Sequence, residues 1–300
     1  MITDWIRKRQ FELQERRESF VTATVVKVQH PSSATAGNVA LVRADGALEG
    51  FVGGICAEQS VRAYSLEAIA SGEPLLLRIM PDPASGPTGE EDVIASEEGS
   101  VTVRNPCLSG GAIEVFLDPT VPPPRVLVAG DSPIVAALGD LGPAVGFEIA
   151  TKPAADDLAL IVAAHGRDEL EPLRAAVEAG LPYIGLVASR SRGAAVLEEL
   201  RQAGLDPAAV ARIETPAGID IGAVTPGEIA LSILAQVIAV RRRGGADAGP
   251  ARPASAEKAA VTAIDPVCGM TVVLDADTPR AQRDGETFYF CCDGCRRAFA

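Results

Sequence analysis

The sequence predicts an α/β protein in which an N-terminal α+β domain, residues 1–120, precedes a parallel-sheet domain and a small cysteine-rich module. From residue 125 to 243, short apolar runs alternate with helical patterns, as a parallel sheet requires. Residues 264–300 hold four of the six cysteines. Between these two parts, residues 244–263 are rich in alanine, glycine and proline, which is typical of a flexible linker.

Composition limits the possible functions. A chain of 300 residues that is 47% hydrophobic and 22% charged can bury two or three cores. The net charge of -13 argues against binding to nucleic acid or to an anionic membrane, because either would need a basic face. The first twenty residues lack the apolar core of a secretory signal, and Ile229–Val240 is too short to span a bilayer. We therefore expect a cytoplasmic protein whose cysteines bind metal or react, since disulfides are rare there.

The N-terminal domain is predicted from mixed periodicities. Alternating residues predict strands, and an Asp45-Gly46 turn joins two of them into a hairpin. A polar loop over Pro81–Glu91 and a proline hinge at Val121–Pro124 complete the domain. The predicted helices are Asp4–Glu18 and Ala57–Ala70, and the predicted strands are Thr22–Gln29, Val39–Arg43, Ala47–Val52, Leu75–Ile79, Ser100–Asn105 and Ala112–Leu117.

Two segments of this domain place a cysteine beside glycines. The first contains Gly53, Gly54, Cys56 and Glu58, and the second is NPCLSGGAIEVF with Cys107, Gly110 and Gly111. Glycines allow the backbone to approach a ligand closely, so each thiol is a candidate binding residue. The alternative is that each cysteine is a small buried hydrophobe, and the sequence leaves both interpretations open.

The parallel-sheet domain begins with a strand, a glycine turn and a helix. Val126–Ala129 is apolar, Gly130 ends the strand, Ser132 can cap a helix, and Pro133 fits the first helical position. This order is typical of a Rossmann-like, doubly wound fold. A dinucleotide fingerprint, however, needs a glycine in place of Ser132, and Pro133 removes an amide that would face the pyrophosphate. We therefore expect NAD(P) to bind weakly or not at all.

The remaining elements of this domain alternate as expected. Ligands in such sheets bind beyond the carboxyl ends of the strands, which selects His165, Ser189, Arg190 and Arg192. The histidine could instead be structural, and one arginine could lie on the surface of the next helix. The predicted strands are Phe147–Ala150, Leu158–Ala164 and Tyr183–Ala188, and the predicted helices are Leu170–Ala179 and Gly193–Ala203.

A last helix begins with a capping box formed by Thr225 and Glu228. The loop before it carries Gly218, Asp220 and Gly222, and we expect that it could close over a ligand.

Tyr183–Arg190, Thr215–Ala223 and Thr225–Ala235, together with the two cysteine segments, closely resemble the xanthine dehydrogenase accessory factors, the XdhC/CoxI family. The resemblance covers roughly Val21–Val240 and includes Gly130 and His165. It implies a maturation chaperone that binds molybdenum cofactor transiently, supports its sulfuration and delivers it to a xanthine or carbon monoxide dehydrogenase type of hydroxylase. The implied partners are the hydroxylase apoenzyme and a cysteine desulfurase, while a homodimer stays open. The candidate cofactor-binding residues are Gly54, Cys56, Glu58, Cys107, Gly110, Gly111, Gly130, His165, Ser189, Arg190, Gly218 and Asp220.

The C-terminal segments Asp265–Met270 and Phe288–Cys295 resemble the YHS domain, a small metal-associated module. About forty residues bury too little apolar area to fold unaided, so a metal is expected. The predicted ligands are Cys268, Cys291, Cys292 and Cys295, whose soft sulfurs suit zinc, copper(I) or iron. The site could be purely structural, or it could sense or deliver metal.

Two function classes follow. The first is a non-catalytic cofactor carrier with a pocket between the first domain and the sheet, edged by Cys56 and Cys107. The second is an NAD(P)-binding oxidoreductase with a metal-binding tail. The sequence contains no evident nucleophile with an activating base, which favours an accessory protein over an enzyme.

Overall fold

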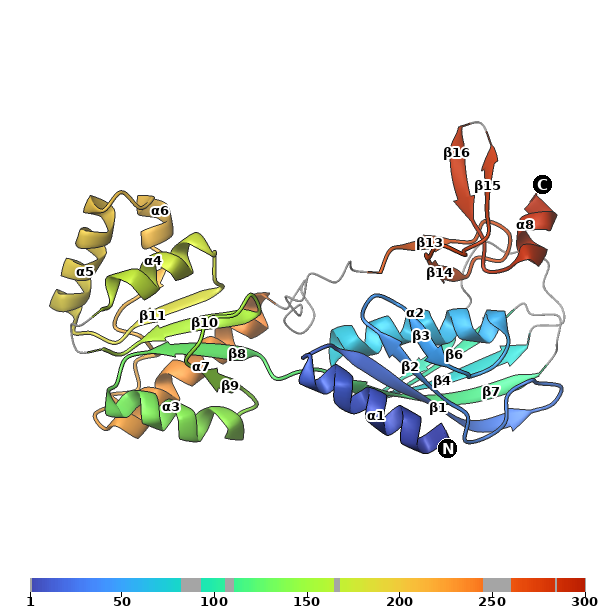
Figure 1. Ribbon diagram of the computed structural model, residues 1–300, viewed down its shortest axis with the longest axis horizontal. Coiled ribbons are helices and arrows are strands. Elements are labelled where there is room, and N and C mark those ends of the chain that lie inside the picture. Colours follow the sequence, from blue (N-terminus) through green and yellow to red (C-terminus); the bar gives the residue numbers. More distant parts are fainter. Residues whose placement is uncertain are drawn as a thin grey trace. The chain divides into compact units, whose positions relative to one another are not determined.

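The computed structural model describes the chain in two compact units, Met1–Pro122 with Ala256–Ala300, and Pro123–Ser255 (Figure 1). The described residues are 2–81, 93–105, 111–164, 168–244, 260–283 and 285–299.

A mixed sheet forms the centre of the first unit. Its strand order is β3-β2-β1-β7-β4-β6-β5, and β4 pairs with β6 in parallel while the other pairs are antiparallel. Helix α2 packs on this sheet through Val61, Tyr64 and Ala68, against strand residues such as Val115. The elements are α1 (Ile2–Glu15), β1 (Phe20–Gln29), β2 (Val39–Arg43), β3 (Leu48–Gly50), α2 (Ile55–Ser71), β4 (Leu75–Pro81), β5 (Val93–Glu97), β6 (Ser100–Asn105) and β7 (Ala112–Thr120).

All the predicted elements of this domain are present, β2 and β6 with the predicted bounds and the others with shifted ends, and one strand was not predicted. Helix α1 ends at Glu15 because Arg17 adopts a positive φ of 57°, which an α-helix does not allow. The first hairpin turns at Asp45-Gly46 as expected, with the Asp45 carboxylate accepting a hydrogen bond from the amide of Ala47. The missed strand, β5, is short, and its last residues are a serine and a glutamate, so period-two alternation does not reveal it.

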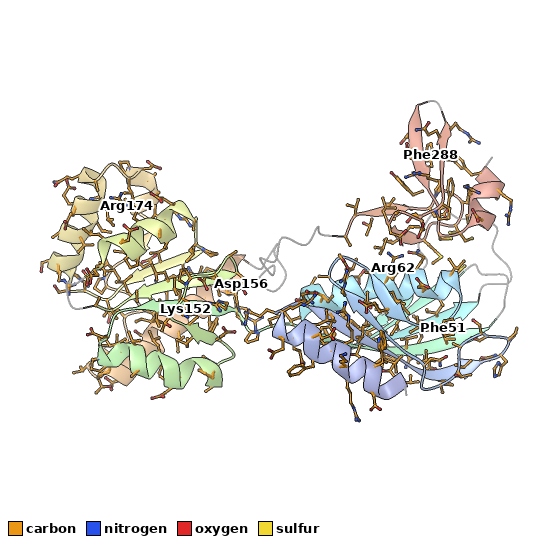
Figure 2. The ribbon with its side chains drawn as sticks, viewed as in Figure 1. Phe51, Arg62, Lys152, Asp156, Arg174 and Phe288 are labelled. Carbon is orange, nitrogen blue, oxygen red and sulfur yellow. The ribbon has the colours of Figure 1, made fainter. Side chains whose placement is uncertain are left out.

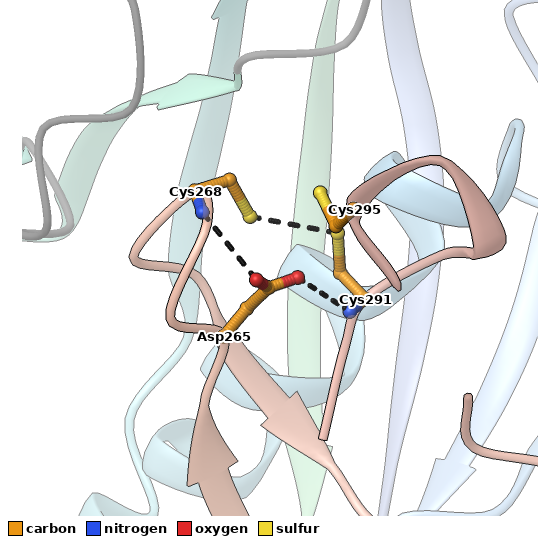
Figure 3. Close-up of side chains that lie close together, drawn as sticks. All are labelled: Asp265, Cys268, Cys291 and Cys295. Carbon is orange, nitrogen blue, oxygen red and sulfur yellow. Dashed lines mark hydrogen bonds between the residues drawn. The ribbon is translucent and has the colours of Figure 1, made fainter. Parts of the chain in front are cut away.

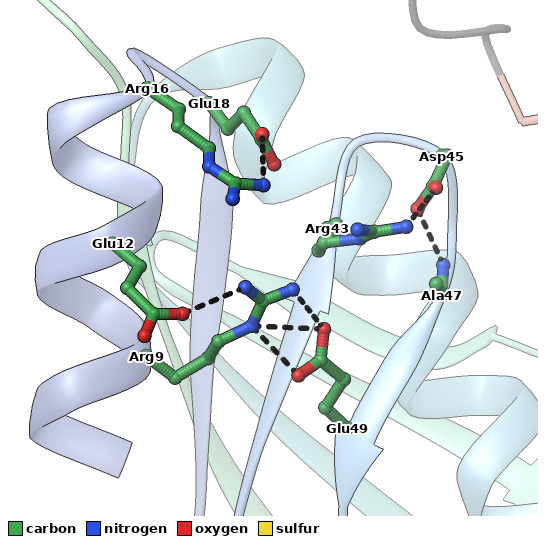
Figure 4. A network of polar contacts seen from close by, with 8 residues as sticks. All are labelled: Arg9, Glu12, Arg16, Glu18, Arg43, Asp45, Ala47 and Glu49. Atoms are coloured by element: carbon green, nitrogen blue, oxygen red, sulfur yellow. Dashed lines mark hydrogen bonds and ion pairs between the residues drawn. The ribbon is translucent and has the colours of Figure 1, made fainter. Parts of the chain in front are cut away.

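An ion-pair network attaches α1 to the edge of the sheet (Figure 4). The Arg9 guanidinium donates to both carboxylate oxygens of Glu49 on β3, at 2.8 and 2.9 Å, and to Glu12 at 3.1 Å. Hydrogen bonding to Arg9 holds the pKa of Glu49 below its usual value, against the opposing effect of burial. The bidentate geometry fixes where the helix lies along the sheet.

The second unit is a parallel sheet covered on both faces, which confirms the Rossmann-like prediction. Its strand order is β12-β11-β10-β8-β9, and every residue of β10 is buried. Helices α3 and α7 cover one face through residues such as Leu138 and Leu234, and α4, α5 and α6 cover the other, as Figure 1 shows. The elements are β8 (Arg125–Ala129), α3 (Pro133–Ala144), β9 (Glu148–Ala150), β10 (Asp157–Val162), α4 (Leu170–Glu178), β11 (Tyr183–Leu186), α5 (Arg190–Gln202), α6 (Pro207–Val210), β12 (Ile213–Glu214) and α7 (Pro226–Gly244).

Of the two helix N-termini predicted in this unit, one shows the expected side-chain capping and the other does not. The capping box of α7 is confirmed: Glu228 accepts from the amide of Thr225 at 2.8 Å, and Thr225 accepts from the amide of Glu228 at 3.3 Å. At α3, Pro133 occupies the first turn as expected, but the Ser132 side chain does not cap. Its buried Oγ finds no hydrogen-bond partner among the described residues.

The C-terminal module belongs to the first unit and consists of two small hairpins and a helix. Strand β13 (Thr262–Ile264) pairs with β14 (Thr271–Val273), and β15 (Arg280–Arg283) pairs with β16 (Glu286–Tyr289), before α8 (Asp293–Phe299). Across the described residues of the whole chain, no helix is long and apolar enough to cross a membrane.

Candidate metal centre

The C-terminal module gathers one carboxylate and three thiols at the point where its hairpins meet α8 (Figure 3). The ligand atoms of Asp265, Cys268, Cys291 and Cys295 all lie within 4.8 Å of one another. Asp265 and Cys268 come from the β13–β14 turn, Cys291 follows β16, and Cys295 lies one helical turn further on, in α8. Cys291 lies outside α8, so the bend before the helix brings its sulfur to that of Cys295.

Asp265 organises this group. Its carboxylate is fully buried and accepts hydrogen bonds from the amides of Val267 at 2.8 Å, Cys268 at 3.4 Å and Cys291 at 2.8 Å. One side chain thus ties together the two chain segments that carry the sulfurs. A carboxylate oxygen has lone pairs beyond those used by amides, so Asp265 can also bind a cation.

The sulfur separations fit a tetrahedral metal. Cys268 Sγ and Cys291 Sγ are 3.5 Å apart, and Cys291 Sγ and Cys295 Sγ are 3.6 Å apart. A disulfide would need about 2.05 Å. At a zinc–sulfur distance of about 2.3 Å, tetrahedral geometry separates neighbouring sulfurs by about 3.8 Å. The donor set of sulfur and carboxylate therefore fits a thiophilic divalent ion, and copper(I) or iron suits the sulfurs as well.

The protonation state of the Cys291 and Cys295 thiols depends on whether a metal is bound. Hydrogen bonds to Cys268 and then Cys56, followed by burial, raise the pKa of the Cys291 thiol above its usual range. Burial chiefly raises the pKa of Cys295 as well. Without a cation, these thiols keep their protons at neutral pH. A bound metal would displace the protons, and its positive charge would stabilise the thiolates.

Cys292 lies in a second, overlapping group. Its sulfur joins those of Cys291 and Cys56, with all three within 4.8 Å of one another. The four predicted sulfur ligands therefore do not form one set: Asp265 stands with Cys268, Cys291 and Cys295, while Cys292 stands with Cys56.

In the N-terminal domain, the first glycine-cysteine segment begins α2. Gly54 is the N-cap residue, and Cys56 and Glu58 lie in the first helical turn. Cys56 is half-buried, with the sulfurs of Cys291 and Cys292 within 4.8 Å of its own, while a Cβ on Gly54 would meet only Ser33 Oγ, at 3.9 Å. The positive end of the helix dipole favours an anion at this place.

The second glycine-cysteine segment is described only in part. A Cβ on Gly111 would lie 1.8 Å from the carbonyl oxygen of Pro31, so backbone packing alone requires glycine there. Cys107 and Gly110 lie outside the described residues.

Three of the residues predicted at the edge of the parallel sheet, Gly130, Ser189 and Arg192, have structural roles. Gly130 has a φ of 118°, and a Cβ there would lie 2.3 Å from the carbonyl oxygen of Ala163, so the turn needs glycine to pack against the end of β10. Ser189 caps α5 by accepting from the amide of Arg192, whose guanidinium pairs with Glu169. Arg190 is exposed at the start of the same helix. His165 lies outside the described residues.

The loop before α7 is tethered to that helix. The amide of Gly218 donates to Gln236 at 2.7 Å, and a Cβ on Gly218 would lie 2.3 Å from Ser232 Oγ. Tyr183 donates to the same Gln236 oxygen at 2.8 Å. Asp220 is exposed and accepts from the amide of Gly222. The geometry of Gly218 is thus explained by packing.

Sequence models of known families match three stretches of the chain. The XdhC and CoxI family matches residues 13–80, the XdhC Rossmann domain matches residues 126–237, and the YHS domain matches residues 263–300. The first two matches together span more than half of the 300 residues. The chain belongs to the XdhC and CoxI family. Cys56 lies within the family match, and the candidate metal centre lies within the YHS match.

One curated relative is an Escherichia coli K12 protein named YqeB and described as uncharacterized, 27% identical over 275 residues. The alignment covers 81% of this chain, and the chain spans about half (48%) of that protein's length. A solved structure described as a xanthine dehydrogenase from Bacillus halodurans is 18% identical, with a TM-score of 0.36 over 79% of this chain and 95% of that one.

Asp265 is the site residue that the sequence-based prediction missed. It appears in the motif as the first residue of Asp-Pro-Val-Cys, three positions before a cysteine. That spacing is typical of an aspartate that caps a turn, and a ligand-bearing cysteine in the same turn is the signal that could have identified it.

Proposed function

We propose that this chain is an accessory factor for molybdenum hydroxylases, which holds molybdenum cofactor as cargo and supports its sulfuration and transfer to the apoenzyme. Its C-terminal module holds a thiophilic metal. Membership of the XdhC and CoxI family supports the cargo function, and the sulfur–carboxylate group supports the metal function.

The observation that carries the cargo function is the position of Cys56. This half-buried thiol lies in the first turn of α2, after Gly53 and Gly54, inside the stretch that matches the family. The cargo is a pterin dithiolene that carries a molybdenum ion and an anionic phosphate, so a thiol at the positive end of a helix offers both a soft ligand and a favourable potential.

Apolar surface beside Cys56 supports docking of a partner. Phe51 is 45% exposed and Ile55 is 63% exposed, on either side of the two glycines. Large hydrophobic side chains are costly in water and are covered when a pterin ring or a protein surface binds. The hydroxylase apoenzyme is the proposed partner for this surface, and a cysteine desulfurase is the proposed source of sulfur.

The test is purification of the full chain without oxygen from a molybdenum-replete host, followed by measurement of molybdenum and pterin. We expect both to co-purify with the wild type in equal amounts and to be absent from Cys56→Ser. Cys268→Ser, which changes only the C-terminal centre, is the matched control and should keep the molybdenum. Bound NAD(P) without pterin would contradict the proposal and favour a redox enzyme.

A further inference from the structure

Cys291 belongs to both sulfur groups of the described structure. Its Sγ lies 3.5 Å from Cys268 and 3.6 Å from Cys295 within the C-terminal module. The same sulfur lies within 4.8 Å of Cys292 and of Cys56, which comes from the start of α2. The second group thus brings together sulfurs from two parts of the chain that are 235 positions apart.

Specific polar contacts hold these two parts together. Gln59 Oε1 accepts a buried hydrogen bond from the amide of Val273 at 3.3 Å. Arg62, which Figure 2 labels on α2, pairs with Asp275 at 3.0 Å. The Arg62 side chain is 6% exposed and also donates to the carbonyl of Gly46 at 2.7 Å. Gln59 and Arg62 follow Cys56 at helical spacing, so one face of α2 presents all three to the module.

The sulfur set suits a soft cation of low coordination number. The group contains only thiols, which select copper(I) among common biological cations when oxygen and nitrogen donors are lacking. With a metal–sulfur distance of about 2.3 Å, trigonal geometry separates the sulfurs by about 4.0 Å, inside the observed limit. A thiolate keeps spare lone pairs, so Cys291 can bridge two soft ions.

We propose that Cys56, Cys291 and Cys292 form a second metal position, which takes copper(I) and clamps the C-terminal module onto α2. When this position of the metal-free group fills first, the three thiols release their protons to solvent and form three copper–sulfur bonds, with no change in oxidation state. When Cys291 already binds the other ion as a thiolate, only Cys56 and Cys292 release protons. Cys291 then bridges this ion to the one held by Asp265, Cys268 and Cys295.

The second position uses the same sulfur that the proposed function assigns to the cargo. Copper at Cys56 and molybdenum cofactor at Cys56 therefore exclude each other. This consequence rests on the proposed function, whereas the copper position itself depends only on the geometry of the sulfurs.

The test is an anaerobic titration of the reduced, metal-free full chain with copper(I), in competition with a chelator of known affinity. We expect two copper ions per wild-type chain, and one in Cys56→Ser and in Cys292→Ser. Cys295→Ser should lose the other ion. An unchanged copper count and affinity in Cys56→Ser would overturn the proposal.

A second measurement uses only the wild type, so it does not depend on the folding of a variant. We expect copper(I) to slow alkylation of Cys56 and of Cys292 by iodoacetamide about tenfold or more, because a metal-bound thiolate is a poor nucleophile. Unchanged alkylation of Cys56 in the copper-loaded chain, or a Cys56–Cys292 disulfide in place of bound metal, would also overturn it. Neither result depends on molybdenum, so failure here is distinguishable from failure of the proposed function.

Discussion

The parallel-sheet domain and the C-terminal module have cores made of different kinds of side chain. In the sheet domain, every residue of β10 is buried, and helices on both faces cover it with hydrocarbon. The apolar cluster of the module contains Met270, Val272 and Cys291, with Leu274 and the remaining cysteines of the module packed around them. The sulfurs of four cysteines thus share this cluster with only a few apolar side chains, whereas hydrocarbon fills the core of the larger domain.

This difference follows from size. A domain of more than one hundred residues buries most of the surface that its unfolded chain exposes, whereas about forty residues cannot. In our proposal, the module compensates with donor atoms that gain stability when they bind a cation. The sheet domain should therefore be indifferent to metal, and the module should depend on it.

The largest expected effect comes from Cys291→Ser, which removes the sulfur shared by both groups. Because structural metals contribute on the order of 10 kcal/mol to the folding of small domains, we expect the module to lose its fold and its metal. Trypsin should then cleave after Arg280 and Arg296, while peptides of the sheet domain stay protected. Unchanged trypsin resistance of the module would contradict the comparison.

The second largest effect is expected in the sheet domain. Leu160 is fully buried in β10, so Leu160→Ala should lower the free energy of unfolding by about 2–5 kcal/mol, measured by urea denaturation. Leu231, which is 50% exposed on α7, is the control, and its change to alanine should alter stability by less than about 0.5 kcal/mol. Loss of bound metal in Leu160→Ala would show that the two regions are not independent.

A smaller effect tests how the module holds its ligands. Asp265→Asn keeps the shape of the side chain but removes the negative charge and one acceptor of the Val267, Cys268 and Cys291 amides. We expect metal affinity to fall by about 10–100-fold, as for other groups that orient or supply ligands, when measured by competition with a chelator. An unchanged metal affinity would show that the cysteine sulfurs alone bind the metal and that the Asp265 carboxylate does not contribute.

The smallest effect concerns the contact between the module and α2. Although burial opposes it, hydrogen bonding from Thr278 and the charge of Arg62 lower the pKa of Asp275 below its usual value. A carboxyl with a depressed pKa stabilises the folded state above its unfolded pKa of about 3.9, and this contribution is lost as pH falls through the folded value. Because Asp275 is 45% exposed, we expect less than about 1 kcal/mol.

This prediction is measured as the difference in melting temperature between wild type and Asp275→Asn from pH 6 to pH 3. Protons also compete with metal at the sulfurs, but this effect is the same in the wild type and in Asp275→Asn. It therefore cancels when their melting temperatures are subtracted. We expect the advantage of the wild type to disappear at the acidic end. A difference that stays constant with pH would rule out the ion pair as its source.

The sequence predicted the sheet domain well because its signals are local. Each apolar run of the second unit indicates a buried strand. The Thr225–Glu228 pair, only three positions apart, indicates where α7 begins. Ser132 occupies the N-cap position of α3 as predicted, but its hydroxyl makes no capping hydrogen bond, because a capping residue type does not ensure that its hydroxyl reaches an amide. The YHS-like cysteine positions likewise indicated Cys268, Cys291 and Cys295 as members of one group.

The meeting of Cys56 with Cys292 could not be predicted, because it depends on docking between segments far apart in the chain. Gln59 and Arg62 are polar residues on a helix, and nothing in their spacing distinguishes a solvent-facing position from the buried one that they occupy. The expected pocket between the first domain and the parallel sheet, with Cys107 at its edge, stays a prediction.

Amide hydrogen exchange on the full chain, with metal and after chelation, tests the central claim most directly. The claim is that metal chemistry holds the C-terminal module together and reaches into α2 at Cys56. We predict that chelation speeds exchange in peptides of β14 and α8 and in the first turn of α2, while peptides of β8 and β10 do not change. Module peptides that stay protected after chelation, or a first turn of α2 that does not respond, would contradict the account.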